Sequence, residues 1–280
     1  MPGLRAGCSV SNGHLNSGMN NHLLHITSWF EQYAATFEAT TAEEQRNYDL
    51  KTEHTFRVLS IIKRLAASLS LSAEQMSLAA IIAVCHDVGR FPQFRDYGTF
   101  NDATSVNHAA LAVQTLKGEG ILDALADETR SLVLQAIALH NVFILPDNLD
   151  PYVCRFAMLI RDADKLDIFR VLIDYCSAAI DERGAAVVYE LPVTGRCSRR
   201  ALDEVIAGRM INRNLLTTAD DFKLLQLSWA YDLNFKESFI LLSELGHIET
   251  LVNLLPEQPG CKQAADAVRG YVDNRIINLS

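Results

Sequence analysis

The stretch LAAIIAVCHDVG, residues 78–89, decides the fold, because an almost wholly apolar run ends in an adjacent imidazole and carboxylate, His86 and Asp87. The capping-box sequence Ser72-Ala73-Glu74-Gln75 precedes this run, so we expect a buried helix that opens there and stops at Gly89. In apolar surroundings an unpartnered imidazole or carboxylate would cost roughly several kcal/mol. The run therefore predicts both a helical core and a partner for the two polar side chains.

Four more side chains of the metal-binding type lie in or at the ends of segments with helical apolar spacing: His54, His108, His140 and Asp164. Histidine nitrogen and aspartate oxygen suit Fe, Mn, Ni, Zn or Mg. Helices that each offer one or two ligands to a common centre can build a metal site inside a bundle. A lone histidine in an apolar helix is more often a core residue, but the whole set favours a shared divalent cation.

Helical patterns account for most of the chain, and the fold class that we expect is all-α. The spacing and capping residues predict helices at 41–69, 72–89, 105–117, 127–141, 150–180, 199–208, 218–233, 235–245 and 263–274, with Ser105, Asp127 and Asp150 as N-caps. Residues 90–104 are rich in Pro, Gly, Asn, Asp and aromatic side chains and predict a loop beside the site. Residues 185–191 are the only strand-like piece.

Composition narrows the class of protein. The 280 residues carry a formal net charge of -9 and no Lys/Arg-rich run, so we expect no nucleic-acid partner. No apolar run approaches the ~20 residues needed to cross a bilayer, so we expect no membrane partner. The 6 cysteines are widely spaced, which is typical of reduced thiols in a cytoplasmic protein. Residues 1–21 contain no apolar signal-peptide region and predict a disordered leader, followed by a core at 22–182 and a C-terminal helical extension at 183–280 packed on it.

The order of the metal-type residues resembles a known superfamily, the HD-domain metal-dependent phosphohydrolases, whose pattern is H…HD…D. Here the pattern reads His54, then His86-Asp87, then Asp164 within Ala163-Asp164-Lys165-Leu166. The flanking HDVGR and the Phe-Pro after the doublet are also similar to that superfamily, and the resemblance covers roughly residues 50–180. It implies an HD-domain helical bundle as the catalytic core. It also implies Asp164 as the ligand rather than Asp162 or Asp167, and we expect Asp162 to lie behind the ligands or in solvent.

Members of the superfamily with two metals have two extra histidines between the doublet and the last aspartate, and His108 and His140 fall in that interval. This resemblance implies that Asp87 bridges two ions, with His54, His86 and Asp164 on one and His108 and His140 on the other. A single ion, with both extra histidines contacting substrate, is the alternative. The chain lacks the Gly-Tyr-Pro signature, which argues against cyclic di-GMP as the substrate.

The activity that the resemblance implies is hydrolysis of a nucleotide or another small phosphoester by a metal-activated water. Asp87 and Lys165 are the expected catalytic residues, and Lys165, Arg90 and Arg95 the expected substrate-binding ones. Lys165 follows a ligand, and the matching lysine of nucleotide-hydrolysing relatives contacts phosphate. Asp96 and Asp102 are candidates for carrying a proton, on loop membership alone.

Two other functions stay open from the sequence. Some members of the superfamily keep the same kind of ligand set but act as di-iron oxygenases. The ligands alone therefore do not distinguish hydrolysis from oxygenation. A non-catalytic nucleotide-binding sensor would bind without turnover, although a degenerate module would be expected to have lost some motif residues. In each case the expected partner is a small phosphorylated molecule or other small substrate, and a homodimer stays open.

Overall fold

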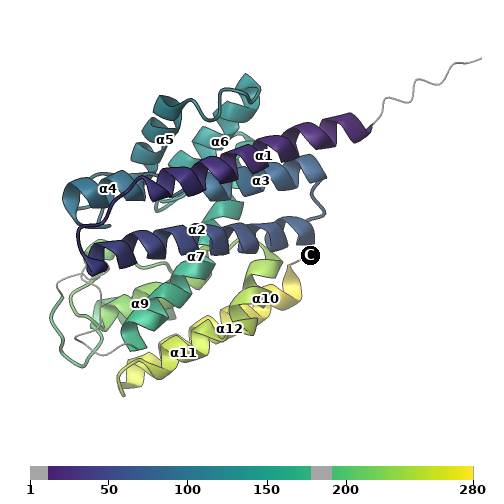
Figure 1. Ribbon diagram of the computed structural model, residues 1–280. Helices are drawn as coiled ribbons and strands as arrows, with labels where there is room; N and C mark the ends of the chain where they lie inside the picture. Colours follow the sequence, from purple (N-terminus) through teal and green to yellow (C-terminus); the bar gives the residue numbers. More distant parts are fainter. Residues whose placement is uncertain (1–11, 178–190, 280) are drawn as a thin grey trace, which may run out of the picture.

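The structure, a computed structural model, describes residues 12–177 and 191–279. Within these ranges the chain is all-α, as predicted, and forms no strand (Figure 1). The strand-like stretch 185–191 lies outside the described residues except for its last one, Leu191. None of the described helices combines the length and the apolar character that a membrane span requires.

The N-terminal part is a bundle of helices around α3 (Ala73–Cys85). Every residue of α3 from Leu78 to Cys85 is buried, because α1, α2, α6 and α7 all pack against this helix. The wholly apolar run therefore belongs to the central helix of the bundle. The surrounding helices are α1 (Asn12–Ala35), α2 (Ala42–Ser68), α4 (Arg90–Tyr97), α5 (His108–Glu119), α6 (Asp127–Leu139) and α7 (Pro151–Ser177).

Three predicted helix starts are confirmed by their capping hydrogen bonds. Ser72 and Gln75 form the complete capping box, with each side chain accepting from the other residue's backbone N–H. The Thr41 hydroxyl accepts from the Glu44 amide at the start of α2. Asp150 Oδ1 accepts from the amides of Tyr152 and Val153, and Pro151 opens α7 as expected.

The segment after the apolar run differs from the prediction. The helix ends at Cys85, residues 86–89 form a turn, and α4 occupies the first half of the predicted loop 90–104. Gly89 has an ordinary φ of -68, so it is not a left-handed helix end. A Cβ at this position would lie 2.2 Å from the carbonyl oxygen of His108 and 2.5 Å from the amide nitrogen of Ala112. Glycine is needed here because the start of α5 approaches the turn closely.

Three other predicted boundaries are wrong. Asn107, not Ser105, caps α5 by accepting from the Ala110 amide, and the N-cap of α6 is Ala126 rather than Asp127. Helix α1 begins at Asn12, so helix covers much of the segment 1–21 for which we predicted disorder; residues 1–11 lie outside the described part.

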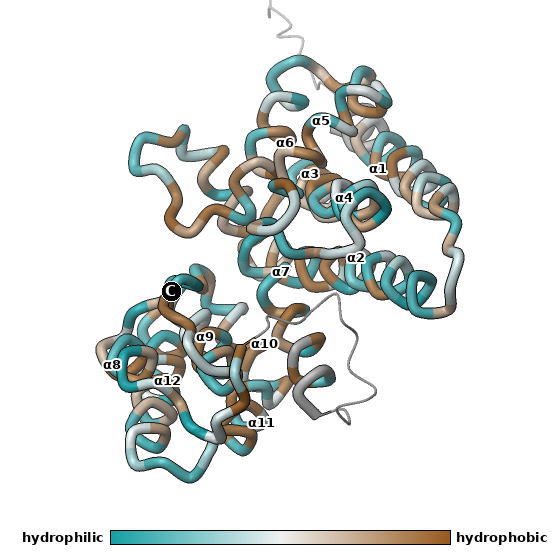
Figure 2. The backbone as a smooth tube through the Cα atoms, turned by 90° about the vertical axis from the view of Figure 1, so that its left-hand side faces the viewer, coloured by the Kyte–Doolittle hydropathy of each residue, from teal (hydrophilic) through white to brown (hydrophobic). Residues whose placement is uncertain are grey.

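The C-terminal part is a group of helices on one side of α7 (Figures 1 and 2). Helices α10 and α11 pack on α7, α10 also reaches α2, and α12 packs along α8. Helix α11 was not predicted. The elements are α8 (Arg199–Ile206), η3 (Arg213–Leu215), α9 (Asp221–Ser228), η4 (Trp229–Asp232), α10 (Lys236–Glu244), α11 (His247–Asn253) and α12 (Pro259–Asn278).

Asp162 of α7 joins the two parts. This buried carboxylate accepts hydrogen bonds from the Asn234 amide at 2.9 Å, from the Phe235 amide at 3.2 Å and from the Ser238 hydroxyl at 2.6 Å, at the start of α10. We had expected Asp162 to lie behind the ligand residues or in solvent, and both expectations are wrong. It places the C-terminal helices against α7, beside the site described next.

Candidate metal centre

The structure brings all of the predicted ligand residues together from five places in the chain. His54 comes from α2, His86 and Asp87 from the turn after α3, and Asp164 from α7. His108 opens α5, and His140 directly follows α6. All except Asp164, which is partly exposed, are buried. They form two groups whose ligand atoms lie within 4.8 Å of one another: His54, His86 and Asp164, and Asp87, His108 and His140.

In the first group, three potential ligand atoms lie close to one another. His54 Nε2 lies 3.3 Å from His86 Nε2 and 3.1 Å from Asp164 Oδ1, and His86 Nε2 lies 3.7 Å from the same oxygen. Metal–nitrogen bonds of about 2.1 Å place two nitrogens of one ion about 3.0–3.4 Å apart. The spacing of this group fits a divalent ion.

The second group has the same geometry. His108 Nε2 lies 2.9 Å from His140 Nε2 and 3.5 Å from Asp87 Oδ1. The two imidazoles meet edge to face, and both Nε2 atoms lie within 4 Å of Asp87 Oδ1. This spacing also fits a shared ion.

Asp87 belongs to the second group but also lies beside the first, with one oxygen toward each pair of histidines. Its Oδ1 is 3.5 Å from His108 Nε2 and 3.9 Å from His140 Nε2. Its Oδ2 is 3.6 Å from His54 Nε2 and 3.8 Å from His86 Nε2. A carboxylate in this position can bridge two ions.

The other ring nitrogen of each histidine is already engaged, which fixes the direction of Nε2. Asp167 Oδ2 lies 2.7 Å from His54 Nδ1, and Asp102 Oδ2 lies 2.7 Å from His108 Nδ1. His86 and His140 direct Nδ1 to the backbone carbonyl three residues earlier, each at 2.7 Å. Carboxylate and carbonyl partners of this kind orient metal-binding imidazoles. The orienting roles of Asp102 and Asp167 were not predicted.

Electrostatics favour the metal-binding forms of His140 and Asp87. Burial, together with the neighbouring His108, lowers the pKa of His140 to about 3, so this ring is neutral near pH 7. Burial opposes ionisation of Asp87, but Lys51 and the nearby histidines and Arg90 outweigh it and hold the pKa of Asp87 well below its usual range. Neutral imidazole and ionised carboxylate are the forms that bind metal.

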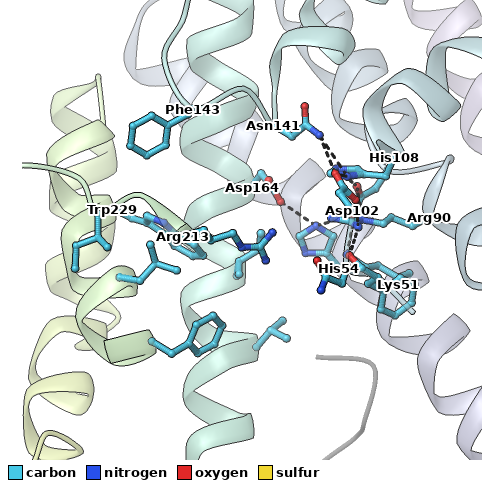
Figure 3. A pocket seen from close by; sticks show the side chains of 18 of the residues that line it. Lys51, His54, Arg90, Asp102, His108, Asn141, Phe143, Asp164, Arg213 and Trp229 are labelled. Atoms are coloured by element: carbon cyan, nitrogen blue, oxygen red, sulfur yellow. Dashed lines mark hydrogen bonds and ion pairs between the residues drawn. The ribbon is translucent and has the colours of Figure 1, made fainter. Parts of the chain in front are cut away.

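Cationic side chains stand beside the ligands. Lys51 Nζ contacts Asp87 Oδ2 at 2.8 Å, and Arg90 is held by Asp102 at 3.0 Å and by the Phe100 carbonyl at 2.6 Å. Arg213 of η3 points toward the same centre from the C-terminal part (Figure 3). Arg90 was predicted, but Lys51 and Arg213 were not. Lys51 had a visible signal, because it lies three residues before His54 and therefore on the same face of α2.

Two predicted substrate-binding residues lie elsewhere. Lys165 Nζ is ion-paired with Asp232 Oδ2 at 2.8 Å, and Arg95 is exposed and paired with its neighbour Asp96 at 2.7 Å. Neither is among the described residues that line the cavity over the ligands. The reason for Lys165 is geometric: adjacent residues on a helix point about 100° apart, so a residue that follows a ligand faces away from it.

A cavity of about 430 Å³ opens over the two ligand groups. Its floor carries His54, Asp87, His108 and Asp164 with Lys51 and Arg90. Its opposite wall comes from the C-terminal part, and Figure 3 shows Arg213 and Trp229 on that side. This volume is in the range of small-molecule binding sites.

An all-α bundle with two histidine–carboxylate groups at its centre is compatible with a metal site. The family model of the HD domain matches residues 52–168, a range that contains every ligand residue named above. Residues 52–168 therefore carry an HD domain, as the resemblance implied, and proteins with this domain are mostly metal-dependent phosphohydrolases. Comparisons with curated proteins and with solved structures gave no match. Residues 169–280 lie outside the matched range.

Proposed function

We propose that this protein is a metal-dependent phosphohydrolase that cleaves a small phosphoester, such as a nucleotide, at a centre of two divalent ions. The observation that carries the proposal is the position of Asp87 between the two ligand groups, with one oxygen toward each. Divalent Fe, Mn, Ni, Zn or Mg held there would supply Lewis acidity. It would also lower the pKa of a bound water toward neutrality, so that the resulting hydroxide could attack phosphorus.

The chain's own cations account for binding of the phosphoryl group. Lys51, Arg90 and Arg213 line the cavity above the ligand residues, where they can hold phosphoryl oxygens and offset negative charge in the transition state. Arg90 is fixed in direction by Asp102 and by the Phe100 carbonyl. We assign to Lys51 and Arg213 the phosphate-binding role that the sequence suggested for Lys165.

The surrounding carboxylates act as positioning groups in this proposal. Asp102 is bound to both His108 and Arg90, and Asp167 to both His54 and Arg57. Each therefore holds one ligand histidine and one arginine in place. This use of Asp102 replaces the proton-carrying role considered from the sequence. Asp96 is exposed, pairs with Arg95 and is not among the described residues that line the cavity, so we do not assign that role to it.

The proposal is tested by metal analysis followed by a panel of phosphoesters in anaerobic buffer with the metal that is found. We expect metal-dependent phosphate release, and a loss of more than about a hundredfold in Asp87→Ala together with loss of bound metal. Asp96→Ala, which alters an exposed aspartate paired with Arg95, is the matched control. It should keep both the bound metal and the phosphate release. Full metal retention in Asp87→Ala would overturn the assignment of Asp87.

The anaerobic assay also separates the other chemistries. A di-iron oxygenase would use the same donor atoms but would need oxygen for turnover, and the three cations around the cavity favour an anionic phosphate instead. A non-catalytic sensor would bind a nucleotide and release no phosphate under any metal.

A further inference from the structure

The cavity over the ligand residues has a second half that comes mostly from residues outside the matched HD domain. Apart from Phe143 and Ile168, the side chains on this side come from residues beyond 168: the end of α7, the segment before η3, and α9 with η4. They are mainly apolar, and Arg213 is the only charged residue among those described there. The apolar side chains that line this half of the cavity include Ile168, Val171, Ile211, Phe222, Leu225 and Trp229.

Two aromatic side chains stand out in this half. Figure 3 shows Trp229 of η4 and Phe143 of the loop after α6 on the side of the cavity away from His54 and His108. The Trp229 ring is steadied by an edge contact with Phe169 at 5.9 Å between centroids. Phe143 is 43% exposed even though it lines the cavity, so part of an apolar ring is open for contact with a ligand.

A single buried arginine holds the supports of both rings. Arg161 donates to the carbonyl oxygens of Val142 and Phe143 in the loop, and to Asp232 Oδ2 at 2.6 Å. Asp232 is the last residue of η4, the element that begins with Trp229. The loop that carries Phe143 and the turn that carries Trp229 are therefore tied to one guanidinium, which fixes their relative position.

The aromatic side chains of this half of the cavity favour one class of organic group in a ligand, the planar ring. Aromatic side chains favour flat rings, because stacked or edge-on ring pairs gain about 0.5–1.5 kcal/mol beyond the apolar area that they bury. A cavity of about 430 Å³ has room for a phosphate and one or two such rings, but not for a polymer enclosed within it.

We infer that Trp229 and Phe143 are specificity-determining residues that hold a planar ring of the substrate while its phosphate lies at the ligand residues. This inference rests on the proposed function, and it narrows the substrate class to small phosphoesters of ring-bearing alcohols, whether the ring is a nucleobase or a simple aryl group. Sugar phosphates and glycerol phosphates without such a ring are poorer substrates.

Binding of phosphonates, which the enzyme cannot hydrolyse, tests the inference without turnover. The chain has 2 tryptophans, Trp29 and Trp229, so Trp29→Phe leaves Trp229 as the only indole reporter. The Zn²⁺-loaded Trp29→Phe protein is titrated with phenylphosphonate, methylphosphonate and hexylphosphonate by fluorescence and by calorimetry. We expect phenylphosphonate to bind about tenfold more tightly than methylphosphonate and to change the Trp229 emission.

Variants in the wild-type background, followed by calorimetry, locate the ring contact. Trp229→Ala should remove most of the preference for phenylphosphonate over methylphosphonate. Because Trp229 also packs on Phe169, Phe143→Ala provides a second variant on an exposed loop position, expected to reduce the preference severalfold. Ile144→Ala is its control: Ile144 is the next residue of the loop, is 73% exposed and does not line the cavity.

The outcomes separate this inference from the proposed function. Equal affinity for the phenyl and methyl compounds would overturn the ring site and leave the phosphohydrolase proposal standing. Tighter binding of hexylphosphonate than of phenylphosphonate would overturn the choice of a planar ring over an alkyl chain. If none of the phosphonates binds to the metal-loaded protein, the phosphate site itself, and with it the proposed function, is wrong.

Discussion

The histidine pairs show how single residues prepare this centre before any ion binds. Each Nδ1 atom lies 2.7 Å from a carboxylate or a carbonyl oxygen, so the four Nε2 atoms converge. The sequence was sufficient to predict which histidines and aspartates come together, because their order matches a known motif. It was insufficient for Asp102, which reaches His108 from a loop whose conformation has no periodic pattern.

Replacing Asp167 with asparagine should weaken metal binding without removing a ligand. Asparagine keeps the shape but not the charge that orients His54 and pairs with Arg57, so we expect metal affinity to fall about tenfold or more. The measurement is a competitive titration against a chromogenic chelator. Asp174→Asn, which alters an exposed aspartate on the same helix paired with Arg170, is the control and should leave the affinity unchanged. Equal affinities for all three proteins would show that Asp167 does not orient a ligand.

At the scale of elements, the close approach of α5 to the turn after α3 places His108 beside Asp87. The helices themselves were largely predictable from apolar spacing and capping residues, as at Ser72 and Asp150. The exact end of α3 was not, because a glycine that stops a helix and a glycine that admits a neighbouring backbone look the same in a sequence. The structure assigns Gly89 to the second kind.

Gly89→Ala should therefore destabilise the protein and disturb the second ligand group. The added methyl group would meet backbone atoms of His108 and Ala112, which cannot rotate away, so we expect a loss of about 1–3 kcal/mol or more in the free energy of unfolding. Gly118→Ala is the matched control within α5: a Cβ there meets nothing within 4 Å, and about 0.4–1 kcal/mol of added stability is expected. Urea denaturation of both variants measures the difference. Equal stability of Gly89→Ala and the wild type would show that α5 does not approach the turn this closely.

At the scale of the whole molecule, the C-terminal helices complete the cavity as well as cover α7. Their packing depends on contacts between residues about seventy positions apart, such as Asp162 with Asn234 and Arg161 with Asp232. No local sequence pattern indicates such contacts. The C-terminal extension was therefore predicted to be helical and packed on the core, but its position over the ligand residues was not predicted. The same contacts explain why Lys165 is directed to Asp232.

Asp162→Ala should lower the stability of the molecule as one unit. Removing this acceptor leaves buried donors at the start of α10 without a partner, at a cost of about 1–3 kcal/mol. Because α10 packs on both α7 and α2, we expect thermal unfolding to stay a single transition with a lower midpoint. Differential scanning calorimetry checks this, and a separate low-temperature transition in the variant would mean that the C-terminal helices unfold independently.

The central claim, that two ligand groups share Asp87, is tested most directly by counting metal ions per chain in the purified, dialysed protein. Mass spectrometry of the bound metals should find two ions per chain in the wild type, one for each group. It should find one ion in His140→Ala, which removes a ligand from the second group only. A single ion in the wild type that persists at the same level in His140→Ala would contradict the account.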